Sequence, residues 1–171
     1  MDDESIFEEL SRIFTYPETD SEPGKMVNPK IFKGVAHPPQ LPSGIVTLQN
    51  EYVRLFINAL PEVPCSPYAS IYLEGRCMGE KTNEIKKLYE KYGLITDEIP
   101  DHIAVELEFL NYLIHLESKG VPVESDLELF VEHMLSWTPG FFKKVEECDK
   151  TGFYKAAAIV ANKALCNCKE R

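Results

Sequence analysis

The prolines of this 171-residue chain are concentrated near its amino terminus, and this limits what the front of the chain can form. Nine of the twelve prolines fall between Pro17 and Pro67, and only three follow them. Because proline lacks a backbone N–H and fixes φ, such a segment disfavours long helices and central strands. We therefore expect an irregular, loop-rich segment over residues 17–46, followed by a regular body.

Outside that segment, apolar residues recur every three or four positions, the spacing of a helix with one buried face. Phe7, Leu10 and Phe14 follow this rule near the amino terminus and predict a helix over residues 4–15. The same spacing predicts helices over residues 47–59, 68–73, 82–92, 101–118, 125–138, 139–148 and 152–165. No segment repeats as a βαβ unit would. The predicted fold class is all-α, a single domain over residues 1–171 with a bundle of six to eight helices.

Several helix ends carry recognisable signals. Gly93 and Gly120 stand where a left-handed residue would stop a helix, and Thr82 is expected to cap the helix that it opens. Ser125 and Glu128 have the spacing of a capping box. We expect Pro139 to end one helix and begin the next, because a first-turn proline loses no hydrogen bond.

The chain is acidic, with 18 Lys and Arg against 28 Asp and Glu and a net charge of −10. Such a chain is repelled by phosphate backbones, so nucleic acid and anionic membranes are poor partners. Residues 97–132 contain ten acids and one Lys, which makes this block either a solvated surface or a negative field for a cationic ligand.

The amino-terminal residues, the apolar runs and the cysteines predict a cytoplasmic protein. The first residues are acidic where a secretory signal would be basic, and no apolar run approaches the length of a membrane span, so no stable membrane insertion is expected. The five cysteines are an odd number without the spacing of a disulfide framework, which fits a reducing compartment. Whether the protein is a monomer or a domain-swapped homodimer stays open.

Catalytic motifs are weak. The segment from Gly75 to Lys81 lacks the spacing of a phosphate loop. His102, Glu106 and His133 are the residues of an alternative reading, a metal- or nucleotide-dependent hydrolase, but they form no recognised ligand motif. Asp101 stands where a helix begins. A structural role there, as a cap or a partner of the helix dipole, is at least as well supported as a catalytic one. We expect a protein that is not an enzyme and needs no cofactor.

Aromatic residues with polar tips are numerous in this acidic helical body. Most aromatic side chains at helical spacing belong to a core. Together with the surplus of acids they also permit a groove that buries an apolar peptide face and holds Arg or Lys at its rim. The residues are Tyr52, Tyr68, Tyr72, Tyr89, Tyr92, Tyr112 and Trp137.

A series of short motifs, each weak alone, occurs in a fixed order. They are EYVRLF over residues 51–56, PCSPYASIY over 64–72, EIPDH over 98–102, ELEFL over 106–110, HMLSW over 133–137 and FYKAA over 153–157. In this order and spacing the chain resembles the TorD/DmsD-type family of cytoplasmic chaperones for molybdenum redox enzymes.

The resemblance implies a non-catalytic all-α protein that binds the twin-arginine signal peptide and the immature catalytic subunit of a molybdopterin oxidoreductase. Such a chaperone assists cofactor insertion and assembly and delays export; a structural subunit of a redox complex is a further alternative. It implies that His133 and Trp137 form a further, structural motif. The implied peptide-binding residues are Tyr52, Arg54, Leu55, Phe56, Pro67, Tyr68, Tyr72, Glu98, Asp101 and His102.

Overall fold

The computed structural model describes residues 3–18, 27–36, 38–39 and 44–170. Within these residues it contains seven α-helices, a 3-10 helix, a π-helical segment and no β-strand, so the predicted all-α class and helix number are confirmed. The elements are α1 (Asp3–Ile13), η1 (Pro29–Phe32), α3 (Ile45–Tyr52), η2 (Val53–Ile57), α4 (Ala69–Glu74), α5 (Glu80–Lys91), α6 (Ile103–Ser118), α7 (Glu124–Cys148) and α8 (Phe153–Lys169). No helix in these ranges is both long and apolar enough to cross a membrane.

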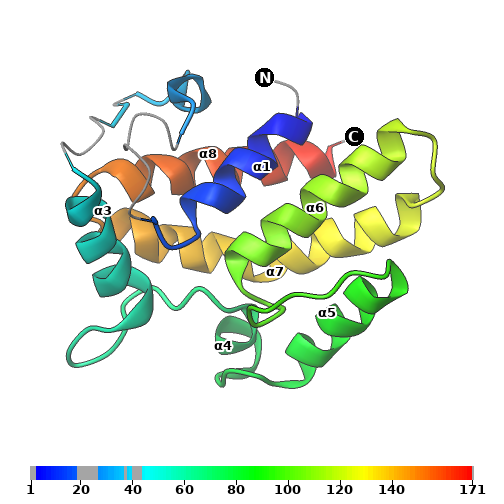
Figure 1. The fold of residues 1–171 in the computed structure, drawn as a ribbon, viewed down its shortest axis with the longest axis horizontal. Coiled ribbons are helices and arrows are strands. Elements are labelled where there is room, and N and C mark those ends of the chain that lie inside the picture. The colour runs from blue at the N-terminus through cyan, green and yellow to red at the C-terminus, as the bar shows by residue number, and fades with distance from the viewer. Residues whose placement is uncertain (1–2, 19–26, 37, 40–43, 171) are drawn as a thin grey trace.

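Four helices form the body of the molecule (Figure 1). The short α1 packs along α6, and the two long helices α7 and α8 pack along each other. Figure 1 shows α3 at one end of this body, while α4 and α5 lie together on one side of it. The loop between α5 and α6 leads back to the start of α6, the helix that packs along α1 (Figure 1).

The core is rich in aromatic rings that join elements far apart in sequence. Phe14, after α1, lies 6.1 Å from Phe56 in η2 and 5.7 Å from Phe141 in α7, measured between ring centroids. Phe56 in turn meets Tyr154 of α8 edge to face at 5.3 Å. Each such pair adds about 0.5–1.5 kcal/mol to the free energy gained by burial alone. The cluster fixes η2 against α1, α7 and α8.

The prediction that Pro139 separates two helices is wrong, because α7 continues from Glu124 to Cys148 with the proline inside it. Proline removes one intrahelical hydrogen bond. Pro139 itself is exposed, but Trp137 before it and Phe141 after it are both buried in the same core. Burial on both sides of the proline holds the helix axis in place.

Two predicted caps are also wrong. The helix expected to begin at Thr82 starts at Glu80, and the carboxylate of Glu74 accepts hydrogen bonds from the backbone N–H groups of Glu80 (3.0 Å) and Lys81 (3.2 Å). The helix expected to open with a capping box at Ser125 begins one residue earlier, without a side-chain cap. Gly93 and Gly120 do have positive φ values of 71° and 76°, as their helix ends require.

The proline-rich segment over residues 17–46 is irregular where the structure describes it, apart from η1 and the start of α3 at Ile45, two residues earlier than predicted. Phe32 of η1 packs against Phe153 of α8, with 5.9 Å between ring centroids. Residues 19–26, 37 and 40–43 of the predicted irregular segment lie outside the described residues.

Candidate functional site

A groove of about 510 Å³ opens between the end of α1, the π-helical segment η2, the connection before α6, and α6 itself. It combines aromatic and aliphatic walls with acidic side chains. Its lining residues are Ser11, Thr15, Tyr16, Tyr52, Phe56, Ile57, Pro67, Tyr68, Thr96, Asp97, Glu98, His102, Ala104, Val105 and Glu108.

Six of the ten residues expected to bind a peptide line this groove, although they come from three separate parts of the sequence. They are Tyr52, Phe56, Pro67, Tyr68, Glu98 and His102. The other four lie elsewhere. The tertiary fold therefore brings together the two motifs that are most distant from each other in the predicted set.

The wall formed by η2 depends on its π-helical backbone. A π segment inserts a residue into an α-helix and turns the side chains that follow it. Val53–Ile57 has this geometry, and it ends with Phe56 buried beneath the groove and Ile57 55% exposed beside it. Tyr52, the last residue of α3 and directly before this segment, donates from its hydroxyl to the carbonyl oxygen of Phe14 at 3.0 Å. This bond ties the junction of α3 and η2 to the turn that follows α1.

The opposite wall is a crossing of two short extended segments that precede α4 and α6. Tyr68 and His102 form an antiparallel bridge, and their rings lie 5.3 Å apart. The N–H of Ile103 donates to the carbonyl oxygen of Pro67 at 2.8 Å, and the N–H of Ala69 donates to that of Asp101 at 3.0 Å. The starts of α4 and α6 are thus held together, with the two rings on the groove side.

Asp101 stabilises this crossing by a hydrogen bond in the interior. It is fully buried, and its Oδ2 accepts a hydrogen bond from the backbone N–H of Ser70 at 2.8 Å. Asp101 therefore caps α4, a helix 31 residues earlier, instead of the helix that it precedes. The cap of α6 is His102, whose Nδ1 accepts from the N–H of Ala104 at 3.2 Å.

The charge of the groove is negative. Asp97, Glu98 and Glu108 line it, and none of the fifteen described lining residues is Lys or Arg. Burial lowers the pKa of His102, against the opposing effects of Glu98 and Asp101, so this ring is neutral near pH 7. Burial raises the pKa of Tyr68 to about 12, which keeps its hydroxyl protonated. The groove therefore offers a negative potential to a cationic ligand.

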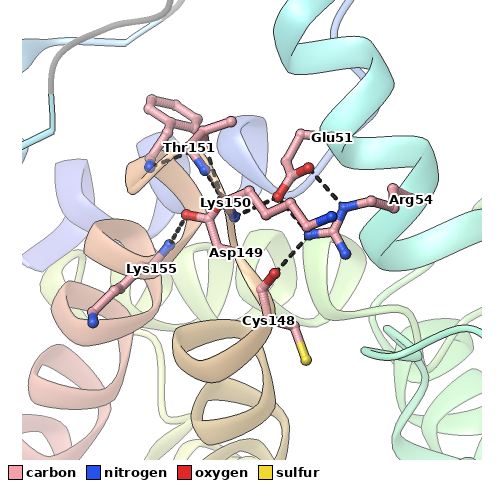
Figure 2. Close-up of polar contacts among 8 residues, drawn as sticks. Glu51, Arg54, Cys148, Asp149, Lys150, Thr151 and Lys155 are labelled. Carbon is pink, nitrogen blue, oxygen red and sulfur yellow. Dashed lines mark hydrogen bonds and ion pairs between the residues drawn. The ribbon is translucent and has the colours of Figure 1, made fainter.

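Arg54 does not line the groove. It clamps η2 to the turn between α7 and α8 (Figure 2). Its guanidinium donates to both carboxylate oxygens of Glu51, at 2.8 and 2.6 Å, and to the carbonyl oxygen of Cys148 at 2.6 Å. The N–H of Lys150 also donates to Glu51, at 2.7 Å. Although burial opposes it, hydrogen bonding by Arg54 and Lys150 lowers the pKa of Glu51. Leu55, next to Arg54, is fully buried in the core.

Trp137 of α7 is buried, and the half-buried Tyr72 of α4 packs against it. Their rings are 5.5 Å apart, and Lys144 approaches the face of the Tyr72 ring at 5.2 Å. Neither residue lines the groove.

Trp137 shares a carboxylate with His133. The indole Nε1–H donates to Glu106 Oε2 at 3.0 Å, and His133 Nε2 lies 2.8 Å from Glu106 Oε1. Glu106 is fully buried, so burial raises its pKa despite both partners. Burial alone would lower the pKa of His133, but the carboxylate outweighs that effect and raises it. The three side chains join α6 to α7.

The alternative hydrolase would need His102, Glu106 and His133 in one place. His102 lines the groove, whereas His133 lines a different cavity between α5 and α7. Among the described residues, no group of three His, Cys, Asp or Glu side chains is arranged to hold a metal ion. The carboxylate of Glu74 also occupies the start of α5, where a phosphate loop would bind its anion. The geometry gives this alternative no support.

Comparison with known proteins identifies the family. The family described as nitrate reductase delta subunit matches residues 40–143, more than half of the chain. The chain belongs to this family. Its match includes η2, the crossing before α6, and most of α7.

The curated relatives that match this chain are chaperones and not catalytic enzymes. They confirm the resemblance to the TorD type. Chaperone protein TorD from Aliivibrio fischeri is 36% identical over 104 residues, 53% of this chain and 48% of the relative. That of Vibrio parahaemolyticus is 35% identical over 125 residues, covering 65% and 57%. Chaperone protein TorD from Vibrio cholerae is 28% identical over 107 residues, 56% of this chain and 49% of its own length. The chain thus spans about half the length of the curated relatives it matches.

A solved structure extends the likeness to nearly the whole chain. A protein from Archaeoglobus fulgidus described as a redox enzyme maturation protein superposes with a TM-score of 0.64 and 31% identity. The match covers 95% of this chain and 94% of that one. The two proteins share the same all-helical fold.

Several groove residues of this family member were missed by sequence reasoning. Ser11 belongs to α1, and Thr15 and Tyr16 lie in the segment that follows it. Asp97 and Glu108 belong to the acidic block over residues 97–132. The acidic block was a signal for the last two. The first three carry no local signal, because only the packing of α1 on α6 brings them to the groove.

Proposed function

We propose that the protein is a cytoplasmic redox-enzyme maturation chaperone that holds the twin-arginine signal peptide and the immature catalytic subunit of a molybdopterin oxidoreductase. In this role it assists cofactor insertion and assembly before export. The observation that carries the proposal is a groove with apolar walls, three acids and no basic side chain among its described lining residues. The family and the chaperone relatives support it.

The chemistry of the groove matches a leader peptide with paired arginines and neighbouring apolar residues. Guanidinium groups are attracted to Asp97, Glu98 and Glu108, and all three side chains are exposed enough to reach them. Apolar residues of the peptide lose contact with water against Ile57 and the ring of Tyr68. Both contributions act in one place, which gives selectivity for a peptide that has both features.

The affinity is expected to be moderate. A flexible leader loses conformational entropy when it binds, and this offsets part of the interaction energy. Exposed charge pairs each contribute little and are screened by salt. A complex of this kind can release its client, as export requires.

The test is binding of a fluorescent twin-arginine peptide measured by anisotropy at several salt concentrations. We expect the dissociation constant to rise with salt and to increase about tenfold or more when Arg-Arg is changed to Ala-Ala. Glu98→Gln should weaken binding, whereas Glu147→Gln, a matched change of an exposed acid on α7 outside the groove, should not. Equal binding of the two peptides would refute the proposal.

The family description favours one second candidate, a structural subunit of a redox complex, because it names a reductase subunit. The two functions differ in what the protein accompanies in the cell. A chaperone leaves the client once maturation is complete, whereas a structural subunit copurifies with the mature reductase in constant proportion. Affinity purification from cells, with cofactor content measured on the associated subunit, separates them.

A further inference from the structure

A second cavity of about 350 Å³ lies beside the groove, on the other side of the loop between α5 and α6. The two are not independent, because four residues line both: Thr96, Asp97, Val105 and Glu108. The loop that separates them is held at its far end by the hydroxyl of Tyr89, which donates to the carbonyl oxygen of Pro100 at 2.9 Å. The cavities are therefore two compartments along the same face of α6.

The second cavity, like the groove, has aromatic walls. Tyr89, Phe109 and Tyr112 line it together with Leu94 and Ile95. The ring centroids of Tyr89 and Phe109 are 4.5 Å apart, and those of Phe109 and Tyr112 are 6.3 Å apart. Its acids, Asp97 and Glu108, are the two that it shares with the groove. Negative charge is thus placed at the junction, with apolar surface on both sides.

One apolar side chain at the edge of this cavity is almost fully in water. Ile95 is 95% exposed, although it belongs to a loop whose neighbour Leu94 packs against the core. An isoleucine in water gains nothing for the free protein, but it adds apolar area to any ligand that enters the cavity.

We propose that this second cavity is an apolar subsite for the same peptide, and that it takes a bulky aliphatic or aromatic side chain beyond the arginine pair. The inference rests on the proposed function. His102, at the groove end of α6, and Tyr112, in the second cavity, are ten residues apart, which is about 15 Å along the helix axis. An extended peptide covers that distance in about four to five residues. With the arginines at Glu98, the acid that lines only the groove, the two cavities define the spacing between the arginines and the apolar anchor.

The experiment compares a twin-arginine peptide with versions that carry a Leu-Phe block on either side after spacers of one, five or ten Gly-Ser residues. On one of the two sides of the arginine pair, the block at the five-residue spacing should lower the dissociation constant about tenfold. The blocks at the other spacings should lower it less. Ile95→Ser and Tyr112→Ala should each remove most of that gain and leave binding of the block-free peptide unchanged.

Leu60→Ser is the matched control, since Leu60 is a 96% exposed loop residue that lines neither cavity. Because the side chains of Ile95 and Leu60 are both exposed to water, Ile95→Ser and Leu60→Ser should fold normally. The comparison of these two variants therefore remains valid even if Tyr112→Ala does not fold. If the block adds nothing at any spacing, or if Ile95→Ser leaves the gain intact, the subsite is refuted while arginine-dependent binding, and with it the proposed function, still stands. Loss of discrimination between Arg-Arg and Ala-Ala would instead refute the proposed function.

Discussion

Replacing Glu106 with alanine is expected to lower the free energy of unfolding by about 3–5 kcal/mol, the range for breaking a buried charged pair. Glu106 is fully buried on α6 and accepts hydrogen bonds from two side chains of α7. The substitution leaves the indole N–H of Trp137, itself buried, facing an apolar space. It also removes the carboxylate that holds His133.

The magnitude follows from these two contacts. A buried donor left without an acceptor costs about 1–3 kcal/mol, and a hydrogen bond to a charged group contributes about 1.5–3 kcal/mol. The shortened side chain leaves a cavity, which adds to the loss. Partial collapse of the site offsets some of this, so the sum stays near the stated range.

Glu106→Gln gives a sharper result, because the amide keeps the shape and one acceptor. Its oxygen must face Trp137, which is only a donor, so its NH₂ faces His133 and requires that ring to be neutral. In the wild-type protein the pKa values of Glu106 and His133 are both raised. The folded pair then holds more protons than the unfolded chain, so its stabilising contribution is fully present below the unfolded His pKa of about 6.5 and is lost as pH rises through the folded value.

In the Glu106→Gln variant, the stabilisation by the protonated Glu106–His133 pair disappears. Burial then lowers the pKa of His133, because no carboxylate opposes it. The stability difference between wild type and Glu106→Gln should therefore be largest at low pH and shrink as pH rises. Urea denaturation followed by tryptophan fluorescence at pH 5.5–8.5 measures this difference. Glu108→Ala, an exposed change on the same helix, is the control and should stay within about 0.5 kcal/mol of wild type. A Glu106→Ala loss below about 1 kcal/mol, or a Gln difference that grows with pH, would show that the pair is not holding α6 to α7.

Three further outcomes are expected. Asp101→Ala removes the acceptor for the N–H of Ser70 and should cost about 1–2 kcal/mol in urea denaturation, whereas Asp101→Asn keeps an acceptor and should lose clearly less; equal losses would contradict the capping role. Arg54→Ala should lower the melting temperature measured by calorimetry more than Arg54→Lys, since Lys still pairs with Glu51, and an unchanged melting temperature would argue against the clamp. Glu108→Gln should weaken twin-arginine peptide binding up to about fivefold and flatten its salt dependence without changing stability, and an unchanged salt dependence would remove Glu108 from the binding surface.

The helices were predictable because each buries one face. Leu48, Tyr52 and Phe56, for example, recur at helical spacing and are all buried, even though the backbone changes from α to π between them. A periodic pattern reports which face is covered, but it does not distinguish α from π geometry. The shift to π decides that Ile57 reaches the groove while Arg54 turns toward α7 and α8.

The helix ends were predicted less well, because caps can come from residues distant in sequence. Asp101 looks like the cap of the helix it precedes, yet it caps α4 across 31 residues. Pro139 looks like a helix boundary, yet core residues on both sides keep α7 continuous. Local rules describe an isolated segment, and in both places tertiary burial outweighs them.

By itself, the sequence determined the all-helical class, the buried faces, the acidic character and the family resemblance, since all of these are properties of order and spacing along the chain. Only the tertiary structure decided which of the implied binding residues meet. Tyr68 and His102 line one groove. Arg54 binds the turn between α7 and α8, Tyr72 packs on Trp137, and Asp101 caps α4. The physical reason is that side chains far apart in sequence share a site only after the helices have packed, and the packing depends on the whole core at once.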